Sequence, residues 1–454
     1  MPYKHQQAGK GGHSDIVRNP DVATFLQNCQ YIREPTDDEG AHVAGTFKAA
    51  PGGIHALPFK IAASDASTYN EPINGKFPST QIGYVKVSVV LIDMKQFAAL
   101  SAPGSRYVDP FKVAAMHRNA DGVSFTLPGS NIRYGGEKTV RDGFRRAVFD
   151  QFSDPRTNFD PQGGYRVIDT LLVLAHHHSL NKCPVCTEKF SVPIQFSPKS
   201  LTCPCPDCGA TVYASDLLSL HEEISDFGNN ATVITRFMNV AEHLMMASLI
   251  RMLADKSPQT LSKVGFIIDG PLALFGRPAW IHKPLMALYY DIEQALATKS
   301  LPPPIIIGLQ KDGQVMEHAR AVQRFLAPNS YRPVDDDYRQ KWITGSPSEA
   351  ATHGSETYYG QDFIFRTEHG GIFCVGLPYP MREKGNEAVF SVEKTNVARY
   401  GDRLGRAFDV VREFEFDLYE NSIIPVALAH RHASISLVPG GKVLDLVTRA
   451  GLGV

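Results

Sequence analysis

The chain has 454 residues, 43% of them hydrophobic and 20% charged, which is the composition of an ordinary globular protein. Its 46 Lys and Arg residues are balanced by 47 Asp and Glu residues, so no overall positive field attracts it to nucleic acid or to an anionic membrane. It starts without the apolar segment of a signal peptide and contains no uncharged apolar run of membrane-spanning length. We therefore expect a cytoplasmic protein of two or three domains, or one domain with insertions.

The N-terminal region predicts an extension followed by a pair of strands. Residues 1–58 are polar and rich in Gly and His, with one short helix expected near 22–34. The apolar segment 59–67 predicts a strand that ends at Asp65, and the alternating stretch 83–93 predicts a longer strand paired with it. The two strands would form an antiparallel pair that opens a mixed sheet.

The middle of the chain alternates helical and strand patterns. The expected elements are a helix near 139–152, an apolar segment at 166–178, a helix at 237–255, a strand at 264–269, a helix at 279–297, a strand at 304–313 and a helix at 314–326. The strand, helix and strand that begin at Val264 form a βαβ unit, for which a right-handed crossover is expected. The last third is expected to return to strands at 362–367, 371–377 and 412–419, and it closes on "IIPVALAHRHASISL".

Five of the seven cysteines lie in one short segment. Cys183-Pro-Val-Cys186 and Cys205-Pro-Asp-Cys208 are two C-x-x-C motifs with 18 residues between them, a spacing typical of zinc ribbons. We predict a structural Zn²⁺ bound by these four thiolates, with Cys203 as an alternative to Cys205. A closed site of four sulfurs has no open position, so this zinc would hold an insertion together and would take no part in chemistry.

Three carboxylates are candidates for a second metal site. Asp65 and Asp269 each end a buried-looking strand, and Glu242 lies on the helix that precedes the strand to Asp269. Open α/β sheets bind ligands at the carboxyl ends of their strands, and carboxylate oxygens suit Mg²⁺ or Mn²⁺. Such an ion can activate a water and stabilise the leaving oxygen in phosphodiester cleavage. His430 or His432, in "AHRHAS", could bind the ion or protonate the leaving group.

Here the chain resembles the NurA nucleases. The resemblance rests on motifs that occur in the family's order between about residues 59 and 437, since no single motif is specific. These motifs are "ASDASTYN", "PSTQIGYVKVSVVLID", "VAEHLMMASLIRML", "VGFIIDGPLALFGRPA", "GLQKDG" and "PVALAHRHASIS". The resemblance implies an RNase H-like core with a metal site. It also implies a homodimer that works with a hexameric HerA-type ATPase in DNA end processing or, in bacteria, in antiviral defence against phage.

The resemblance also implies roles for particular residues. Asp65, Glu242 and Asp269 match the ligands of a catalytic Mn²⁺ or Mg²⁺, although Asp65 is followed by Ala where the family usually has Gly. His430 matches the C-terminal catalytic histidine. Lys311, in "GLQKDG", matches a basic position that could contact a DNA phosphate, with a solvated turn residue as the equal alternative.

Simpler roles remain open for several of these residues. The two aspartates could be turn residues that bond their own backbone, and His430 could be a satisfied core histidine. Glu222 or Glu223 could replace Glu242 as the acidic ligand from the region before the strand. The triplet His176–His178 could bind metal, but a hydrogen-bonded or solvated role is favoured.

We therefore expect an α/β protein with an RNase H-like mixed sheet flanked by helices and with an inserted zinc ribbon. The expected regions are an N-terminal polar extension at 1–58, the first part of the nuclease core at 59–175, the zinc-ribbon insertion at 176–215 and the second part of the core with C-terminal strands at 216–454. The expected function is a metal-dependent DNA nuclease, exonuclease or endonuclease, with DNA and a HerA-type ATPase as partners and no membrane. The alternative is a non-catalytic subunit that binds nucleic acid through the ribbon or serves as an adaptor for the ATPase.

Overall fold

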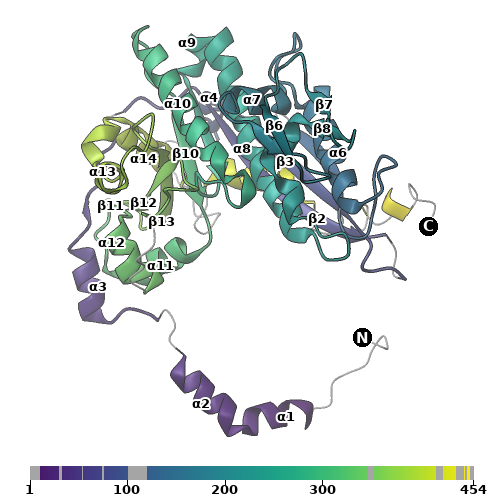
Figure 1. Cartoon of the computed structure of the whole chain (residues 1–454). Helices are drawn as coiled ribbons and strands as arrows, with labels where there is room; N and C mark the ends of the chain where they lie inside the picture. The colour runs from purple at the N-terminus through teal and green to yellow at the C-terminus, as the bar shows by residue number, and fades with distance from the viewer. Residues whose placement is uncertain are drawn as a thin grey trace.

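The computed structural model describes most of the chain. The described residues are 11–29, 33–53, 55–73, 76–100, 120–345, 352–415, 423–435, 444 and 447–449. They form a mixed α/β structure in which helices cover both faces of one large sheet (Figure 1). Within these residues, no helix combines the length and apolar character needed to cross a bilayer.

The large sheet has nine strands. In their order across the sheet they are β1 (Lys48–Ala49), β11 (Ser330–Pro333), β12 (Gly360–Arg366), β13 (Ile372–Pro378), β10 (Ile305–Gln310), β9 (Val264–Asp269), β2 (Lys60–Pro72), β3 (Gln81–Asp93) and β4 (Ala120–Pro128). Strand β9 runs parallel to both β10 and β2, and all the other neighbouring pairs are antiparallel.

Helices pack on both faces because successive strand residues point to opposite sides. Ala62 of β2 joins one apolar cluster, whereas its neighbours Ile61 and Ala63 join the other. The first face carries α3 (Asp37–Ala44), α6 (Val140–Ser153), α7 (Val167–Leu174), α8 (Ala231–Lys256), α10 (His282–Ala297) and α11 (Gln314–Val322). The second face carries α4 (Met94–Ala98), α14 (Arg403–Phe414) and α15 (Ile424–Ala433). The other α-helices with bounds in the described part of the chain are α1 (Gly11–Arg18), α2 (Pro20–Asn28), α9 (Pro258–Leu261), α12 (Asp336–Tyr338) and α13 (Glu387–Glu393), and short 3-10 or π turns join several elements.

The predicted βαβ unit is present as β9, α10 and β10, and the helices predicted at 139–152, 237–255 and 314–326 correspond to α6, α8 and α11. The strand predicted at 412–419 is wrong where it can be compared. Residues 412–414 end α14, and 416–419 lie outside the described residues. The closing segment forms α15, a helix, in its described part. The N-terminal helix expected near 22–34 starts earlier and ends at Asn28.

Strand β2 also differs from its prediction, because it continues past Asp65 to Pro72. It pairs with β9 only as far as Ser64, which lies opposite Ile268, but it pairs with β3 along its whole length. Asp65 is therefore the first residue of β2 beyond the parallel pairing. On the neighbouring strand, Asp269 ends β9 as predicted, and Gly270 turns the chain with a φ of 116° that favours glycine.

The cysteine-rich segment forms two small hairpins beside α6. The first pairs β5 (Leu180–Lys182) with β6 (Lys189–Ile194), and the second pairs β7 (Thr202–Pro204) with β8 (Thr211–Tyr213). Buried Arg145 of α6 attaches the second hairpin: its guanidinium donates to the Thr211 carbonyl oxygen at 2.9 Å and to both carboxylate oxygens of buried Asp216. A desolvated ion pair thus joins the second hairpin to α6.

Candidate metal centres

Three side chains meet beside the end of the parallel strand pair. Asp65 and Asp269 stand next to each other because β2 and β9 pair in register up to the preceding residues. His430 reaches them from α15, which packs on β2, and its Nδ1 lies 2.8 Å from Asp65 Oδ2. One ligand atom from each of the three lies within 4.8 Å of the others. We call this group the aspartate–histidine centre.

Glu242 approaches from the opposite face of the sheet, on α8. Its carboxylate is buried and accepts a hydrogen bond of 2.7 Å from Ser64 Oγ, one residue before Asp65. It lies close enough to Asp65 and Asp269 for their charges to act on it, but it lies outside the aspartate–histidine centre. The structure therefore brings Glu242 to the edge of the site that the sequence predicted, with its carboxylate directed to Ser64.

Lys311 supplies a positive charge to the same place. It follows β10, which lies beside β9 with Leu309 opposite Asp269. The Lys311 ammonium donates to Asp269 Oδ2 at 2.5 Å, and no more than 22% of the lysine side chain is exposed. In this structure Lys311 contacts a carboxylate of the site, which neither of its sequence-based roles included.

Burial dominates the electrostatics of the acidic groups. It raises the pKa of Asp269 to about 7, against the lowering effect of Lys311 and with a further rise from Asp65. Burial also raises the pKa of Asp65 and raises that of Glu242 well above its usual range. For His430, burial and then Lys311 lower the pKa, so its imidazole is neutral at pH 7. Clustered carboxylates with raised pKa values favour a cation that would relieve their repulsion.

The donor set of the aspartate–histidine centre fits Mn²⁺ or Mg²⁺. Two carboxylates and a neutral imidazole are ligands that Mn²⁺ accepts, and Mg²⁺ is commonly bound through one or two carboxylates with water completing its shell. More than half of the His430 side chain, 55%, is exposed, so the centre opens to solvent on that side. An ion held there would therefore be accessible to a substrate.

The alternatives considered from the sequence lie elsewhere. Glu222 pairs with Lys182 and Arg277, and Glu223 pairs with Arg236, so both carboxylates have cationic partners away from the aspartate–histidine centre. His432 is likewise not a member of that group. Of the three consecutive histidines, His178 stacks on the Trp280 ring at 3.9 Å between centroids, and none belongs to a metal-ligand group found among the described residues.

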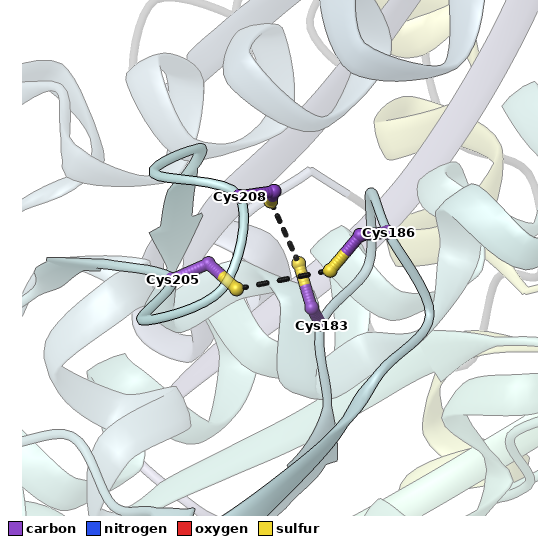
Figure 2. A group of neighbouring side chains, drawn as sticks. All are labelled: Cys183, Cys186, Cys205 and Cys208. Carbon is purple, nitrogen blue, oxygen red and sulfur yellow. Dashed lines mark hydrogen bonds between the residues drawn. The ribbon is translucent and has the colours of Figure 1, made fainter.

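The four cysteine thiols form the second candidate centre, at the tips of the two hairpins (Figure 2). The sulfurs of Cys183 and Cys208 are 3.8 Å apart, as are those of Cys186 and Cys205. Sulfurs bound tetrahedrally at about 2.3 Å from one Zn²⁺ would lie about 3.8 Å from each other. The thiols therefore fit a zinc ion, and Cys203 lies outside this group.

Two serines support the aspartate–histidine centre, and neither was predicted from the sequence. Ser64 holds Glu242, as described, and Ser434 Oγ lies 3.2 Å from the Nε2 of His430. Ser434 follows His430 by four residues, a helical spacing that could have drawn attention to it. Ser64 gave no such signal, because its partner lies 178 residues away.

No family model matches the chain, and no curated protein matches it in sequence. Among solved structures, the NurA nuclease from Sulfolobus solfataricus aligns over 98% of this chain and 99% of its own, with 9% identity and a TM-score of 0.34. A second crystal structure of NurA aligns over 97% and 96% of the two chains, with 10% identity and a TM-score of 0.26.

Proposed function

We propose that the protein is a metal-dependent DNA nuclease of NurA type. The observation that carries the proposal is the convergence of Asp65, Asp269 and His430 within 4.8 Å at the edge of a parallel strand pair. This donor set suits the divalent ions that hydrolytic nucleases use. The resemblance of the sequence motifs to the NurA nucleases supports DNA phosphodiester cleavage as the reaction. Lys311, beside the same carboxylates, is placed to meet an anionic substrate.

In this proposal each residue has a defined role. Asp65 and Asp269 hold a divalent ion, which supplies Lewis acidity and neutralises charge on the scissile phosphate. His430 serves as the third ligand, because a neutral imidazole with a lowered pKa accepts a bond more readily than it gives up a proton. Glu242, held by Ser64 on the other face of the sheet, is a further ligand if its side chain turns toward the ion and ionises there.

The test is cleavage of linear duplex and single-stranded DNA with Mn²⁺, with Mg²⁺ or with EDTA added just before the substrate. We expect ion-dependent cleavage that Asp269→Asn and Asp65→Asn each lower by about a hundredfold or more. Asp93→Asn is the matched control, since Asp93 also ends a strand but only caps α4. Full activity of the Asp269→Asn protein would refute the metal-centre mechanism. No cleavage by folded wild-type protein would favour the binding or adaptor role.

We also propose that the core is RNase H-like. The order β4, β3, β2, β9, β10 across the sheet supports this. The strands β2, β3 and β4 are antiparallel neighbours, and β9 and β10, which follow later in the chain, run parallel to β2. In such a core the carboxylates of the first and fourth strands lie side by side. Asp65 and Asp269 occupy those positions.

We propose that the four-cysteine centre binds a structural Zn²⁺ and makes residues 176–215 a zinc ribbon. Metal analysis of purified protein should give about one zinc per chain, lost in Cys183→Ser and retained in Cys203→Ser, whose sulfur lies outside the group. Loss of zinc should also change Trp280 fluorescence, because Trp280 packs on the cluster that contains Cys183 and Cys205. Equal zinc content in both variants would contradict the assignment.

The nearly balanced charge supports a proposal about partners. Affinity for DNA of any sequence comes largely from Lys and Arg, and 46 of these against 47 acidic residues give a weak net attraction. We propose a homodimer that receives DNA from a HerA-type ATPase, in repair or in defence. Light scattering should give twice the chain mass, and the ATPase should co-purify and increase digestion. A monomer that digests DNA processively without the ATPase would contradict this.

A further inference from the structure

Lys311 is held in place by its backbone and reaches into the aspartate–histidine centre. The Arg320 guanidinium donates to the Lys311 carbonyl oxygen at 2.5 Å, which ties the end of β10 to α11. From there the Lys311 ammonium meets Asp269 Oδ2 at 2.5 Å. The contact is partly shielded, since the exposed fractions of the two side chains are 22% and 15%. A shielded ion pair acts more strongly on its surroundings than an exposed one.

The charge of Lys311 extends over the whole group. It lowers the pKa of Asp65, of Asp269 and of Glu242, and it also lowers the pKa of His430. Its ammonium therefore acts on the same side chains that would surround a divalent ion.

The charge balance of the centre changes when a divalent ion enters it. Ionised Asp65 and Asp269 carry two negative charges, and Lys311 reduces the sum to one negative charge. A divalent ion in the centre would change that sum to one positive charge, so the lysine would repel the ion across a short distance. This repulsion would be relieved if the Lys311 ammonium left Asp269 and bound another anion.

We propose that Lys311 is an internal counter-ion of the aspartate–histidine centre, which neutralises Asp269 before an ion binds, releases it to the ion and then binds an anionic oxygen of the substrate. The inference rests on the proposed function and deepens it. It selects a substrate with a singly charged group close to the ion, as in a phosphodiester. It also couples the two binding events, because substrate binding would gain from Lys311 only when an ion is present.

The competing role for Lys311 is a fixed clamp. A carboxylate has two oxygens, so the lysine could stay on Oδ2 of Asp269 while an ion bound Oδ1. The two roles predict opposite effects of removing the ammonium. Without a clamp, Asp269 would be less well oriented and the ion would bind more weakly. Without a counter-ion, the ion would lose a competitor and bind more tightly.

The first experiment measures Mn²⁺ binding to the full-length, zinc-loaded protein without DNA, from the electron paramagnetic resonance signal of free Mn²⁺. We expect Lys311→Met to lower the Kd by at least about threefold, and Lys311→Arg, which keeps the charge, to stay within about twofold of wild type. Lys86→Met is the matched control, because Lys86 lies on β3 opposite Ser67, away from Asp269. An unchanged or higher Kd for Lys311→Met would overturn the proposal.

The second experiment measures binding of a fluorescent single-stranded oligonucleotide by anisotropy, with Ca²⁺ or with no divalent ion. Lys311→Met should weaken binding by at least about threefold with Ca²⁺ and leave it unchanged without an ion. Equal weakening in both conditions would show a simple phosphate contact and overturn the coupling. Failure of the wild-type protein to bind Mn²⁺ would overturn the metal centre as well, whereas equal Mn²⁺ affinities would overturn only the counter-ion. If Lys311→Met does not fold, Lys311→Gln replaces it in both measurements.

Discussion

At the scale of single residues, the site is defined by what burial does to its carboxylates. Asp65 and Asp269 are adjacent because the two strands end their pairing there. Burial removes water from both carboxylates, which disfavours their ionised forms. The Lys311 ammonium offsets part of the repulsion between the two carboxylates, and the raised pKa of Asp269 favours its protonated form, which reduces the repulsion further. These groups would be costly in a purely structural role, which is why they point to a cation site.

The pKa of Asp269 leads to a testable pH dependence. The folded value of about 7 lies above the usual 3.8, so the folded protein holds a proton that the unfolded chain has released in that interval. This contribution to stability is complete below the unfolded pKa and is lost as the pH rises through the folded pKa, and it amounts to a few kcal/mol at most.

We expect the stability of Asp269→Asn relative to wild type, in protein dialysed free of Mn²⁺ and Mg²⁺, to increase between about pH 4.5 and about pH 8. Urea unfolding at several pH values measures it. The comparison cancels the titration of groups on which Asp269 does not act, and it includes the coupled changes at Asp65, Glu242 and His430. Added Mn²⁺ should stabilise wild type more at the higher pH, because the ion needs ionised carboxylates. A pH-independent difference between the two proteins would show that Asp269 has an ordinary pKa.

At the scale of elements, a buried ion pair joins the second cysteine hairpin to α6. Asp216 is buried, and its carboxylate accepts from Arg145 and from the Tyr213 backbone N–H. The guanidinium of Arg145 also holds the Thr211 carbonyl oxygen. Arg145 therefore bonds both the second hairpin and Asp216, which follows that hairpin in the chain.

Arg145→Met should therefore destabilise the protein by roughly 3–5 kcal/mol, since it leaves the Asp216 carboxylate buried without its cation. Hydrogen exchange within residues 180–213 and urea unfolding measure the effect. The double variant Arg145→Met with Asp216→Leu should recover part of the loss, because it removes the unpaired charge. Arg156→Met is the control: 62% of its side chain is exposed, so we expect about 0.5 kcal/mol or less. A loss as small as the control's would show that the ion pair is dispensable.

At the scale of the whole molecule, buried histidines on separate elements make the free energy of unfolding depend on pH on the acid side. His243 bonds the Tyr359 hydroxyl, His282 the Ala279 carbonyl oxygen, and His318 the Tyr338 hydroxyl. Burial lowers the pKa of each of these three histidines from 6.5 to about 4. The folded protein therefore keeps them neutral in an interval where the unfolded chain binds protons.

We expect stability to fall by several kcal/mol as the pH falls from about 6.5 to about 4, because these histidines, and His353 with them, take up protons only on unfolding. The depressed pKa values place this stabilisation above the unfolded pKa and its loss on the acid side. His318→Gln should reduce the slope of urea midpoint against pH, while His432→Gln, a partly exposed residue, should change it little. A urea midpoint that does not change between about pH 6.5 and about pH 4 in wild type would mean that the pKa values of these histidines are not lowered in the folded protein.

The central part of the fold could be predicted from the sequence because it depends on local patterns. Uninterrupted apolar runs identified β9 and β10, and the spacing of apolar residues identified α8. The closing segment was assigned no element from its sequence. In the structure Pro425 lies in the first turn of α15, where its missing N–H costs nothing. Residues 412–414 alternate like a strand, but Val410, Val411 and Phe414 together pack one face of α14 on the sheet.

The candidate site was predictable only in part, for a related reason. Strand ends can be read from a sequence, so Asp269 and Asp65 could be proposed. Which of them would be neighbours depends on the register between β2 and β9, which no local pattern contains. The same holds for Glu242, whose partner Ser64 is set by the packing of α8, and for Lys311, whose ion pair depends on the alignment of β10.

The distance along the chain between the parts of the site has a consequence for synthesis. Asp65 and His430 are separated by 365 residues, and α15 docks on β2, which is made well before it. While the ribosome is still translating, the nascent chain can pair β2 with β3, but it lacks the histidine of the centre until α15 has left the exit tunnel. A polypeptide that stops before His430 would therefore lack the complete ligand set, so the proposed cutting activity would begin only after α15 has been made.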